Sequence, residues 1–165
     1  QARCIAWERS DEIRPNQLFA ASLEGARLGE QVGALVVDAA QSHLLTPMGM
    51  RTLSPTDQAY CAHYRGPLIE RDRAYHNGTV WPWLLGAMCE ADMRVHRFDD
   101  PSRARTIERV CVLADEMCVG SVGSIAEIYD AELGADKKHA RQGCPAQAWS
   151  VSELLRVLVL ALKID

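Results

Sequence analysis

A ten-residue segment, AYHNGTVWPW (residues 74–83), gathers a Tyr, a His, an Asn and two of the four Trp residues of the chain. Flat apolar rings beside hydrogen-bonding groups suit a wall that holds a sugar ring. Glycoside hydrolysis also requires a pair of carboxylic acids across the sugar bond. Two irregular segments of the chain supply side chains of all these kinds, which are Arg51, Tyr60, Tyr64, Arg71, Asp72, Tyr75, His76, Trp81, Glu127, Asp130, Gln147 and Trp149.

Each of these side chains also has a purely structural interpretation. Asp72 lies between two Arg residues, which is typical of a solvated charge cluster, and His76 can fix a loop through hydrogen bonds. Trp149 can belong to the core, and residues 74–83 can be an ordinary helix start with two core tryptophans. The inventory alone therefore predicts only a polar and aromatic site.

Other chemistries have less support in the sequence. There is no G-x-S-x-G elbow, no Walker-type loop and no G-x-G-x-x-G motif after a strand. The six Cys residues form no C-x-x-C pair, and the five His residues show no metal-ligand spacing. We therefore expect reduced, disulfide-free thiols, no metal and no other cofactor.

Charge and hydropathy bear on partners and compartment. The net charge of −4 gives no electrostatic case for nucleic acid or an anionic membrane. The apolar run at residues 157–162 is far shorter than the ~20 residues that span a bilayer. No secretory signal pattern opens the chain. We expect a cytoplasmic domain that binds neither nucleic acid nor membrane, and the initial Gln favours a piece of a longer protein.

Helical periodicity dominates the elements that must position these side chains. Helices are predicted within residues 29–47, 79–95, 101–120 and 145–163, with a shorter one at 16–23. Thr79 is the predicted N-cap of the second helix, in which Trp83 lies on the apolar stripe and Trp81 does not. No strand-like alternation is evident, so the predicted class is all-α, built of helical hairpins.

Two long connections separate these helices, at residues 46–78 and 120–147. Long connections without regular structure are usually functional in compact domains. Because both lie at the ends of predicted hairpins, they could meet on one side of the helical scaffold, and the site is expected there.

Five motifs in order resemble a known family. These are IRPNQLFAASL, TPMGMRTLSP, RDRAYHNGTVWPWLLG, GSIAEIYD and GCPAQAWSVSELLR, which span residues 13–156. Together they resemble the C-terminal half of the amylo-α-1,6-glucosidase domain of glycogen debranching enzymes. A more distant similarity to glucoamylases lies in GSIAEIYD and AWSVSELL.

The resemblance implies a fold and a set of roles. The fold would be a barrel of six α-helical hairpins, of which residues 1–165 form about half, and the reaction would be hydrolysis of α-1,6-glucosidic branch points with inversion. Glu127 occupies the position of the general base. The predicted substrate-binding residues are Arg51, Asp72, Tyr75, His76, Trp81, Gln147 and Trp149. The expected partner is glycogen or a branched α-glucan oligosaccharide.

One part of the family pattern is missing from the chain. The general acid lies in an upstream Trp-Met-Asp-like motif, which does not occur here. The isolated chain is therefore expected to be inactive, and to self-associate or pair with the N-terminal half of its barrel. Two alternatives stay open, namely a non-catalytic glycan-binding half-domain and a glucoamylase-like α-glucosidase of another linkage preference.

Overall fold

The computed structural model describes residues 11–25, 28–120 and 123–163. The helical elements are a 3-10 turn η1 (Pro15–Leu18), α1 (Phe19–Ser22), α2 (Glu30–His43), α3 (Leu68–Tyr75), α4 (Leu84–Val95), α5 (Asp100–Val119) and α6 (Ala148–Leu162). The strands are β1 (Leu45–Thr46), β2 (Gly49–Arg51), β3 (Val80–Trp81), β4 (Ile128–Leu133) and β5 (His139–Gln142). None of these helices is long and apolar enough to cross a membrane.

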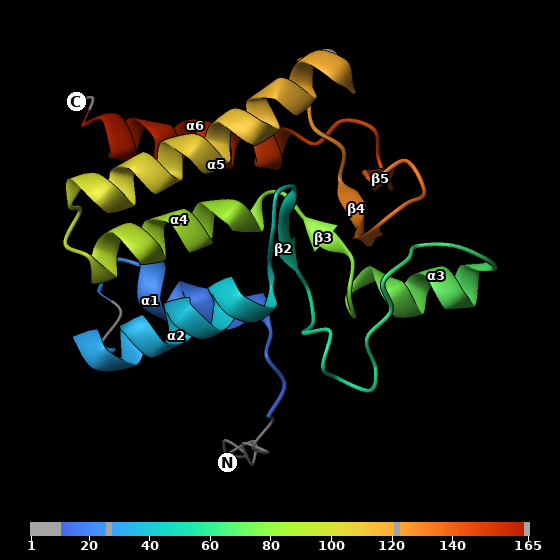
Figure 1. Cartoon of the computed structure of the whole chain (residues 1–165), viewed down its shortest axis with the longest axis horizontal. Coiled ribbons are helices and arrows are strands. Elements are labelled where there is room, and N and C mark those ends of the chain that lie inside the picture. Colours follow the sequence, from blue (N-terminus) through green and yellow to red (C-terminus); the bar gives the residue numbers. More distant parts are fainter. Residues whose placement is uncertain (1–10, 26–27, 121–122, 164–165) are drawn as a thin grey trace, which may run out of the picture.

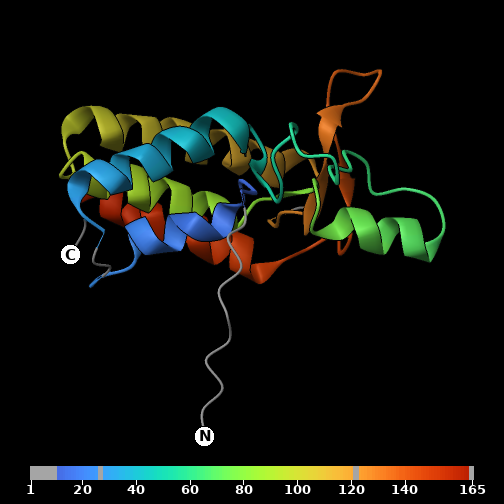
Figure 2. The ribbon, with the colours of Figure 1, turned by 90° about the horizontal axis from the view of Figure 1, so that it is seen from below.

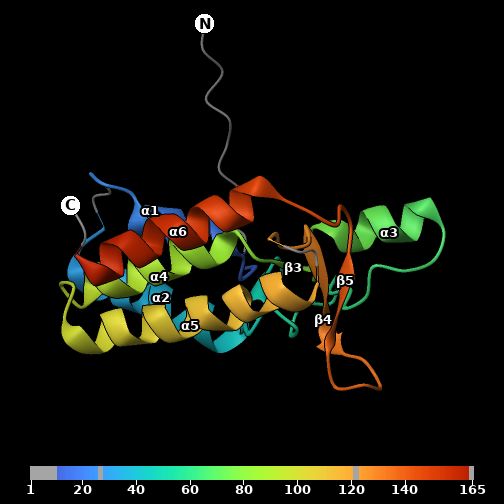
Figure 3. The same ribbon diagram turned by 90° about the horizontal axis from the view of Figure 1, so that it is seen from above.

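Helix α4 lies at the centre of the helical part and is buried from Leu84 to Met93. It contacts α1 and α2 on one side and α5 and α6 on the other, as Figure 1 shows. Seen from above, α6 lies over α4 (Figure 3). The buried apolar residues form two clusters, one toward α2 and one toward α5 and α6. Burying one large apolar side chain such as Leu85 contributes roughly 1.5–3 kcal/mol to the free energy of unfolding. Because α4 contributes buried side chains to both clusters, this central helix supports both.

The all-α prediction is wrong in one respect, because the described residues include a five-stranded antiparallel sheet in the order β1-β2-β3-β4-β5. Met50 lies opposite Trp81, and Val80 lies opposite Tyr129. Most of the strands have only two to four residues, too few to show alternation, and the start of β4 is buried on both faces. The sheet stands at one end of the helices, with α3 beyond it (Figure 2).

The sheet brings the two long connections together. Strand β2 comes from the connection at residues 46–78 and β4 from that at 120–147, and β3 pairs with both. The expectation that the two connections share one side of the scaffold is therefore confirmed. The prediction that Thr79 is the N-cap of this helix is wrong, because α4 begins only at Leu84. The Thr79 hydroxyl instead donates a hydrogen bond to the Tyr75 carbonyl.

Helix faces also differ from the periodicity in places. In α2 the apolar spacing predicts a stripe that includes Val32 and Leu35, but both are exposed. The buried residues of this helix are instead Gly33, Val37 and Ala40. In α5 the buried residues are Ser102, Thr106, Val110 and Leu113. Hydrophobic spacing alone cannot choose between adjacent faces, because neighbouring elements decide which side is covered. The five described cysteines, Cys61, Cys89, Cys111, Cys118 and Cys144, are all free thiols.

The hairpin between β1 and β2 depends on a glycine. Gly49 has φ 131°, and a Cβ there would lie 2.5 Å from the Trp81 carbonyl oxygen and 2.7 Å from the Pro82 Cα. We expect Gly49→Ala to lower the free energy of unfolding by about 1–3 kcal/mol, because the backbone is strained and the clash is with backbone atoms. A urea titration measures the loss.

Gly25→Ala provides a matched control. Gly25 also has a positive φ, 83°, but a Cβ at this position would face open space, with no neighbouring segment within 4 Å. Its expected loss is only ~1 kcal/mol, from backbone conformation alone. Equal losses in the two variants would contradict the close approach of Gly49 to β3.

Candidate functional site

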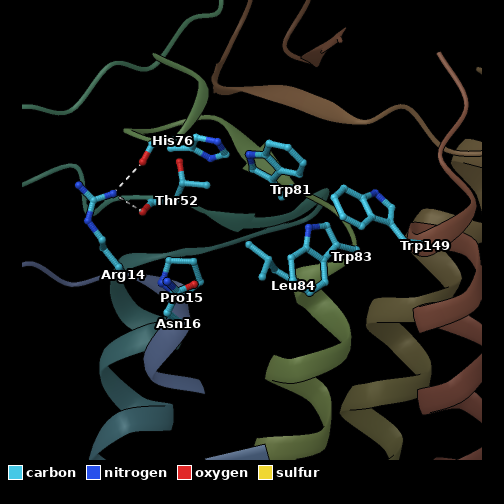
Figure 4. A pocket seen from close by; sticks show the side chains of 9 residues that line it. All are labelled: Arg14, Pro15, Asn16, Thr52, His76, Trp81, Trp83, Leu84 and Trp149. Atoms are coloured by element: carbon cyan, nitrogen blue, oxygen red, sulfur yellow. Dashed lines mark hydrogen bonds between the residues drawn. The ribbon is translucent and has the colours of Figure 1, made fainter. Parts of the chain in front are cut away.

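A cavity of about 330 Å³ opens where the sheet meets the ends of the helices (Figure 4). Its wall combines aromatic rings with polar groups from separate parts of the chain. The nine lining residues are Arg14, Pro15, Asn16, Thr52, His76, Trp81, Trp83, Leu84 and Trp149. A concave site with apolar rings and a few polar groups is typical of a ligand site.

Trp81 is the centre of the aromatic wall. Its ring stacks on His76 at 5.5 Å and meets the edges of Tyr75 at 4.9 Å and Trp149 at 5.8 Å. Trp149 in turn stacks on Trp83 at 5.2 Å. The Trp81 Nε1 donates to the Tyr75 carbonyl at 3.1 Å. The five rings are therefore held in one arrangement by ring contacts and by at least one hydrogen bond.

The exposure of these rings corrects the sequence-based assignment. Trp81, predicted to lie outside the core, is only 5% exposed, whereas Trp83, predicted as core, is partly exposed. The reason is that Trp81 belongs to β3, opposite Met50, rather than to the helix that follows. Trp149 is 43% exposed and offers the most accessible of the three Trp rings of the wall.

Arg14 closes the polar side of the cavity and was not predicted from the sequence. Its guanidinium donates to the His76 carbonyl at 2.7 Å, to the Thr52 carbonyl at 3.2 Å and to Asn77 Oδ1 at 2.9 Å. These bonds join segments 38 to 63 residues apart in the chain. No local pattern predicts such a contact, although Arg14 lies within the first of the five motifs.

Glu127 lies just before β4, next to the aromatic wall. Gln147 Nε2 donates to Glu127 Oε1 at 2.9 Å, and the Cys144 backbone N donates to Oε2 at 3.0 Å. Burial, and then a hydrogen bond of the phenol to the Glu127 carboxylate, raise the pKa of Tyr75 above its ordinary value. Tyr75 therefore links Glu127 to the Trp81 wall, although Glu127 is not among the residues that line the cavity.

Comparison with known proteins identifies the family. A family model described as amylo-alpha-1,6-glucosidase matches residues 5–156. The chain belongs to the amylo-α-1,6-glucosidase family. It is also 29% identical over 159 residues to the glycogen debranching enzyme of Saccharomyces cerevisiae (strain ATCC 204508 / S288c). That match covers 87% of this chain and 10% of the yeast protein, so the chain spans about a tenth of its relative's length.

The structure gathers most of the residues predicted for this family member. Tyr75, His76, Trp81 and Trp149 contact one another, and Gln147 binds Glu127. These residues come from the end of α3, from β3, from the position just before β4 and from the start of α6, which the sheet brings to one end of the helices.

Arg51 and Asp72 lie elsewhere. Arg51 is opposite Val80, hence on the sheet face away from Trp81, and its Nη2 donates to the Ala131 carbonyl at 3.3 Å. Asp72 is exposed on α3 and does not line the cavity. Arg51 lies one residue from Met50 in β2, and a step of one residue along a strand reverses the face of a side chain. The sugar contacts of both residues stay predictions.

Asp130 anchors the segment that faces Tyr75. Its side chain is 1% exposed and accepts from Tyr64 N at 2.9 Å, His63 Nδ1 at 3.0 Å and Arg65 Nη2 at 2.8 Å. Burial alone would raise its pKa, but these hydrogen bonds outweigh it and hold the pKa of Asp130 below its ordinary value. Because the Tyr64 backbone is held by Asp130, the centre of the Tyr64 ring lies 5.6 Å from that of Tyr75.

Proposed function

We propose that the chain is the C-terminal part of an (α/α) barrel that hydrolyses α-1,6-glucosidic branch points of glycogen or a related α-glucan. The observation that carries the proposal is the Glu127 carboxylate, fixed by two donors beside an aromatic-walled cavity. Family membership over residues 5–156 and the similarity to a glycogen debranching enzyme support it.

Glu127 would act as the general base. In an inverting glycosidase the base removes a proton from a water molecule as that water attacks the anomeric carbon, while an acid protonates the leaving oxygen. The two carboxyl groups then lie ~6.5–9.5 Å apart, with the water between them. None of the nine cavity-lining residues is Asp or Glu. Because the upstream Trp-Met-Asp-like motif of the family does not occur in this sequence, we assign the acid to the upstream half of the barrel, and expect the isolated chain to be inactive.

The upstream half is also the partner that we propose for exposed apolar side chains on α6. Leu155, Val159 and Leu162 follow one another at helical spacing and are 62%, 36% and 48% exposed. An exposed apolar stripe of this kind is typical of a helix that packs against another segment. Without the upstream half, the same stripe would favour self-association.

The test of the function is product analysis with the longer protein that contains this chain. An α-glucan with single-glucosyl α-1,6 branches should release free glucose, initially as the β-anomer, which NMR detects directly. Binding without hydrolysis would instead establish a glycan-binding module. Preferred release from linear α-1,4 or trehalose-type substrates would establish a glucoamylase-like enzyme.

The accessible ring of the wall carries a separate prediction. Trp149→Ala should raise KM for a branched dextrin roughly 2- to 10-fold, because a stacking ring contributes ~0.5–1.5 kcal/mol. The value of kcat should stay within about twofold, since a stacking face supports the ground state and the transition state alike. Steady-state kinetics of the longer enzyme measure both constants.

Val112→Ala is the control for this prediction. Val112 lies on α5 and is 40% exposed, close to the 43% of Trp149, but it does not line the cavity. Its substitution should leave KM unchanged. A fall in kcat with unchanged KM in Trp149→Ala would argue against stacking.

A further inference from the structure

The turn formed by residues 143–147 wraps around the side chain of Glu127. From this turn each carboxylate oxygen receives one donor, since the Gln147 amide donates to Oε1 at 2.9 Å and the Cys144 backbone N donates to Oε2 at 3.0 Å. The two donors differ in kind, since one is a side chain and the other is main chain. Together they restrict rotation of the carboxylate about its last bond.

Backbone hydrogen bonds hold the donors themselves in place. Glu127 N donates to the Cys144 carbonyl at 2.8 Å, and Gln147 N donates to the Ile125 carbonyl at 2.9 Å. These bonds extend the pairing of β4 with β5, in which Ile128 lies opposite Gln142. The donors therefore belong to a continuation of the sheet rather than to an unsupported loop.

Gly143 permits the close approach of this turn. Its φ is 68°, and a Cβ there would lie 2.3 Å from Glu127 Oε2 and 3.2 Å from Glu127 Cβ. Any side chain would press on the carboxylate or move the turn away from it. The glycine thus serves the geometry of Glu127 as well as the backbone of the turn.

We infer that Gln147 and Gly143 are positioning residues that orient Glu127, and that Gln147 acts on this carboxylate rather than on the sugar. The inference rests on the proposed function, in which Glu127 is the base. A base must be held within ~0.5 Å of its productive position. An ionised carboxylate has about four lone-pair sites. The two donors of the turn and the Tyr75 phenol therefore fix the group, and they leave about one site free for the attacking water.

The same segment also sets the distance between the base and the aromatic wall. Gln147 is the N-cap residue of α6, and Trp149 follows it within the first turn of that helix. Trp149 contacts Trp81 and Trp83. Residues 143–149 therefore supply both the donors to the carboxylate and the accessible ring.

Substitutions at Gln147 in the longer enzyme test the inference. Gln147→Met keeps the length of the side chain but removes the donor, and should lower kcat roughly 10- to 100-fold while KM stays within about twofold. Gln147→Glu should lower kcat further, because a second carboxylate repels the first. The control is Gln142→Met, on the neighbouring strand β5, which should leave both constants unchanged.

Gly143→Ala disturbs the same carboxylate at its other oxygen, Oε2. This variant provides a second test if a Gln147 variant folds poorly. It too should lower kcat with little change in KM, and thermal unfolding midpoints report whether each variant is folded. A folded Gln147→Met variant that keeps more than half of kcat would overturn the inference. So would a rise in KM at unchanged kcat, which indicates sugar binding by Gln147.

The outcome for Glu127 separates this inference from the function on which it rests. If the wild-type longer enzyme releases no glucose from α-1,6 branches, the proposed function fails. If Glu127→Gln retains activity, Glu127 is not the base, and the part of the proposed function on which this inference rests fails. If Glu127→Gln is inactive while Gln147→Met and Gly143→Ala are fully active, only the positioning role fails.

Discussion

Glu127→Gln in the longer enzyme is expected to lower kcat by on the order of 10²–10⁴-fold, the usual loss when one acid–base group is removed. The amide keeps the size of the side chain but cannot take a proton from water. Binding of a branched oligosaccharide should be nearly unchanged, because the aromatic wall is intact. Rapid-quench or steady-state release of glucose measures the rate, and calorimetric titration measures binding.

Glu132→Gln is the matched control for this variant. Glu132 lies on β4, five residues further along, and its carboxylate accepts a hydrogen bond from the Tyr60 hydroxyl at 2.9 Å. Its substitution should leave kcat within about twofold. If Glu127→Gln kept more than a tenth of the wild-type rate, the assignment would fail. Glu153, paired with Arg156 at 2.9 Å, would be the carboxylate to test next.

Asp92→Asn is expected to destabilise the fold by about 3–5 kcal/mol at neutral pH, the usual cost of removing one partner from a buried ion pair. Asp92 is 1% exposed on the central helix α4. Its carboxylate accepts from Arg105 at 2.8 Å and from Arg109 at 2.9 Å, both on α5. The amide would leave two guanidinium groups without their counter-charge. Urea titration of both proteins measures the difference.

The exposed pair Arg97–Glu30 supplies the control. Its side chains are 78% and 74% exposed, so Glu30→Gln should change the free energy of unfolding by less than about 1 kcal/mol. A loss in Asp92→Asn as small as that in Glu30→Gln would show that the Asp92 cluster does not stabilise the packing of α4 against α5.

The effect of Asp92 depends on pH with a definite sign. Burial by itself raises the pKa of Asp92, but hydrogen bonds and charges from Arg105 and Arg109 outweigh it, so the pKa in the folded state is lowered. Above the unfolded value of about 3.9 the stabilisation is fully present. It is lost as the pH falls through the lowered pKa of the folded state. The difference between wild type and Asp92→Asn should therefore shrink on acidification below about pH 4.

Sequence patterns predicted the family and the helices other than α3, because these features are encoded in residues close together along the chain. Helix α3 lies in the connection that was expected to lack regular structure. Apolar spacing predicted α2, α4, α5 and α6 to within a few residues. The ordered motifs identified the family that the match over residues 5–156 shows. Motif order is a property of the chain itself, so folding is not needed to detect it.

The sheet and its consequences could not be predicted in this way. Strands as short as β1 and β3, with two residues each, carry no periodicity, and the identity of β3 depends on partners more than 25 residues away. Placing Trp81 in β3 reversed the expected burial of Trp81 and Trp83. The same register turned Arg51 away from the cavity.

The sequence alone thus determined which residue types the site contains. It also indicated Glu127 as the candidate base and predicted that both long connections meet on one side of the scaffold. Only the tertiary structure decided which of those residues meet. It placed the Gln147 amide on the Glu127 carboxylate and the Arg14 guanidinium on the His76 carbonyl. Such contacts join residues 20 and 62 positions apart. They form because sheet pairing and the packing around α4 bring distant segments together, which no local pattern encodes.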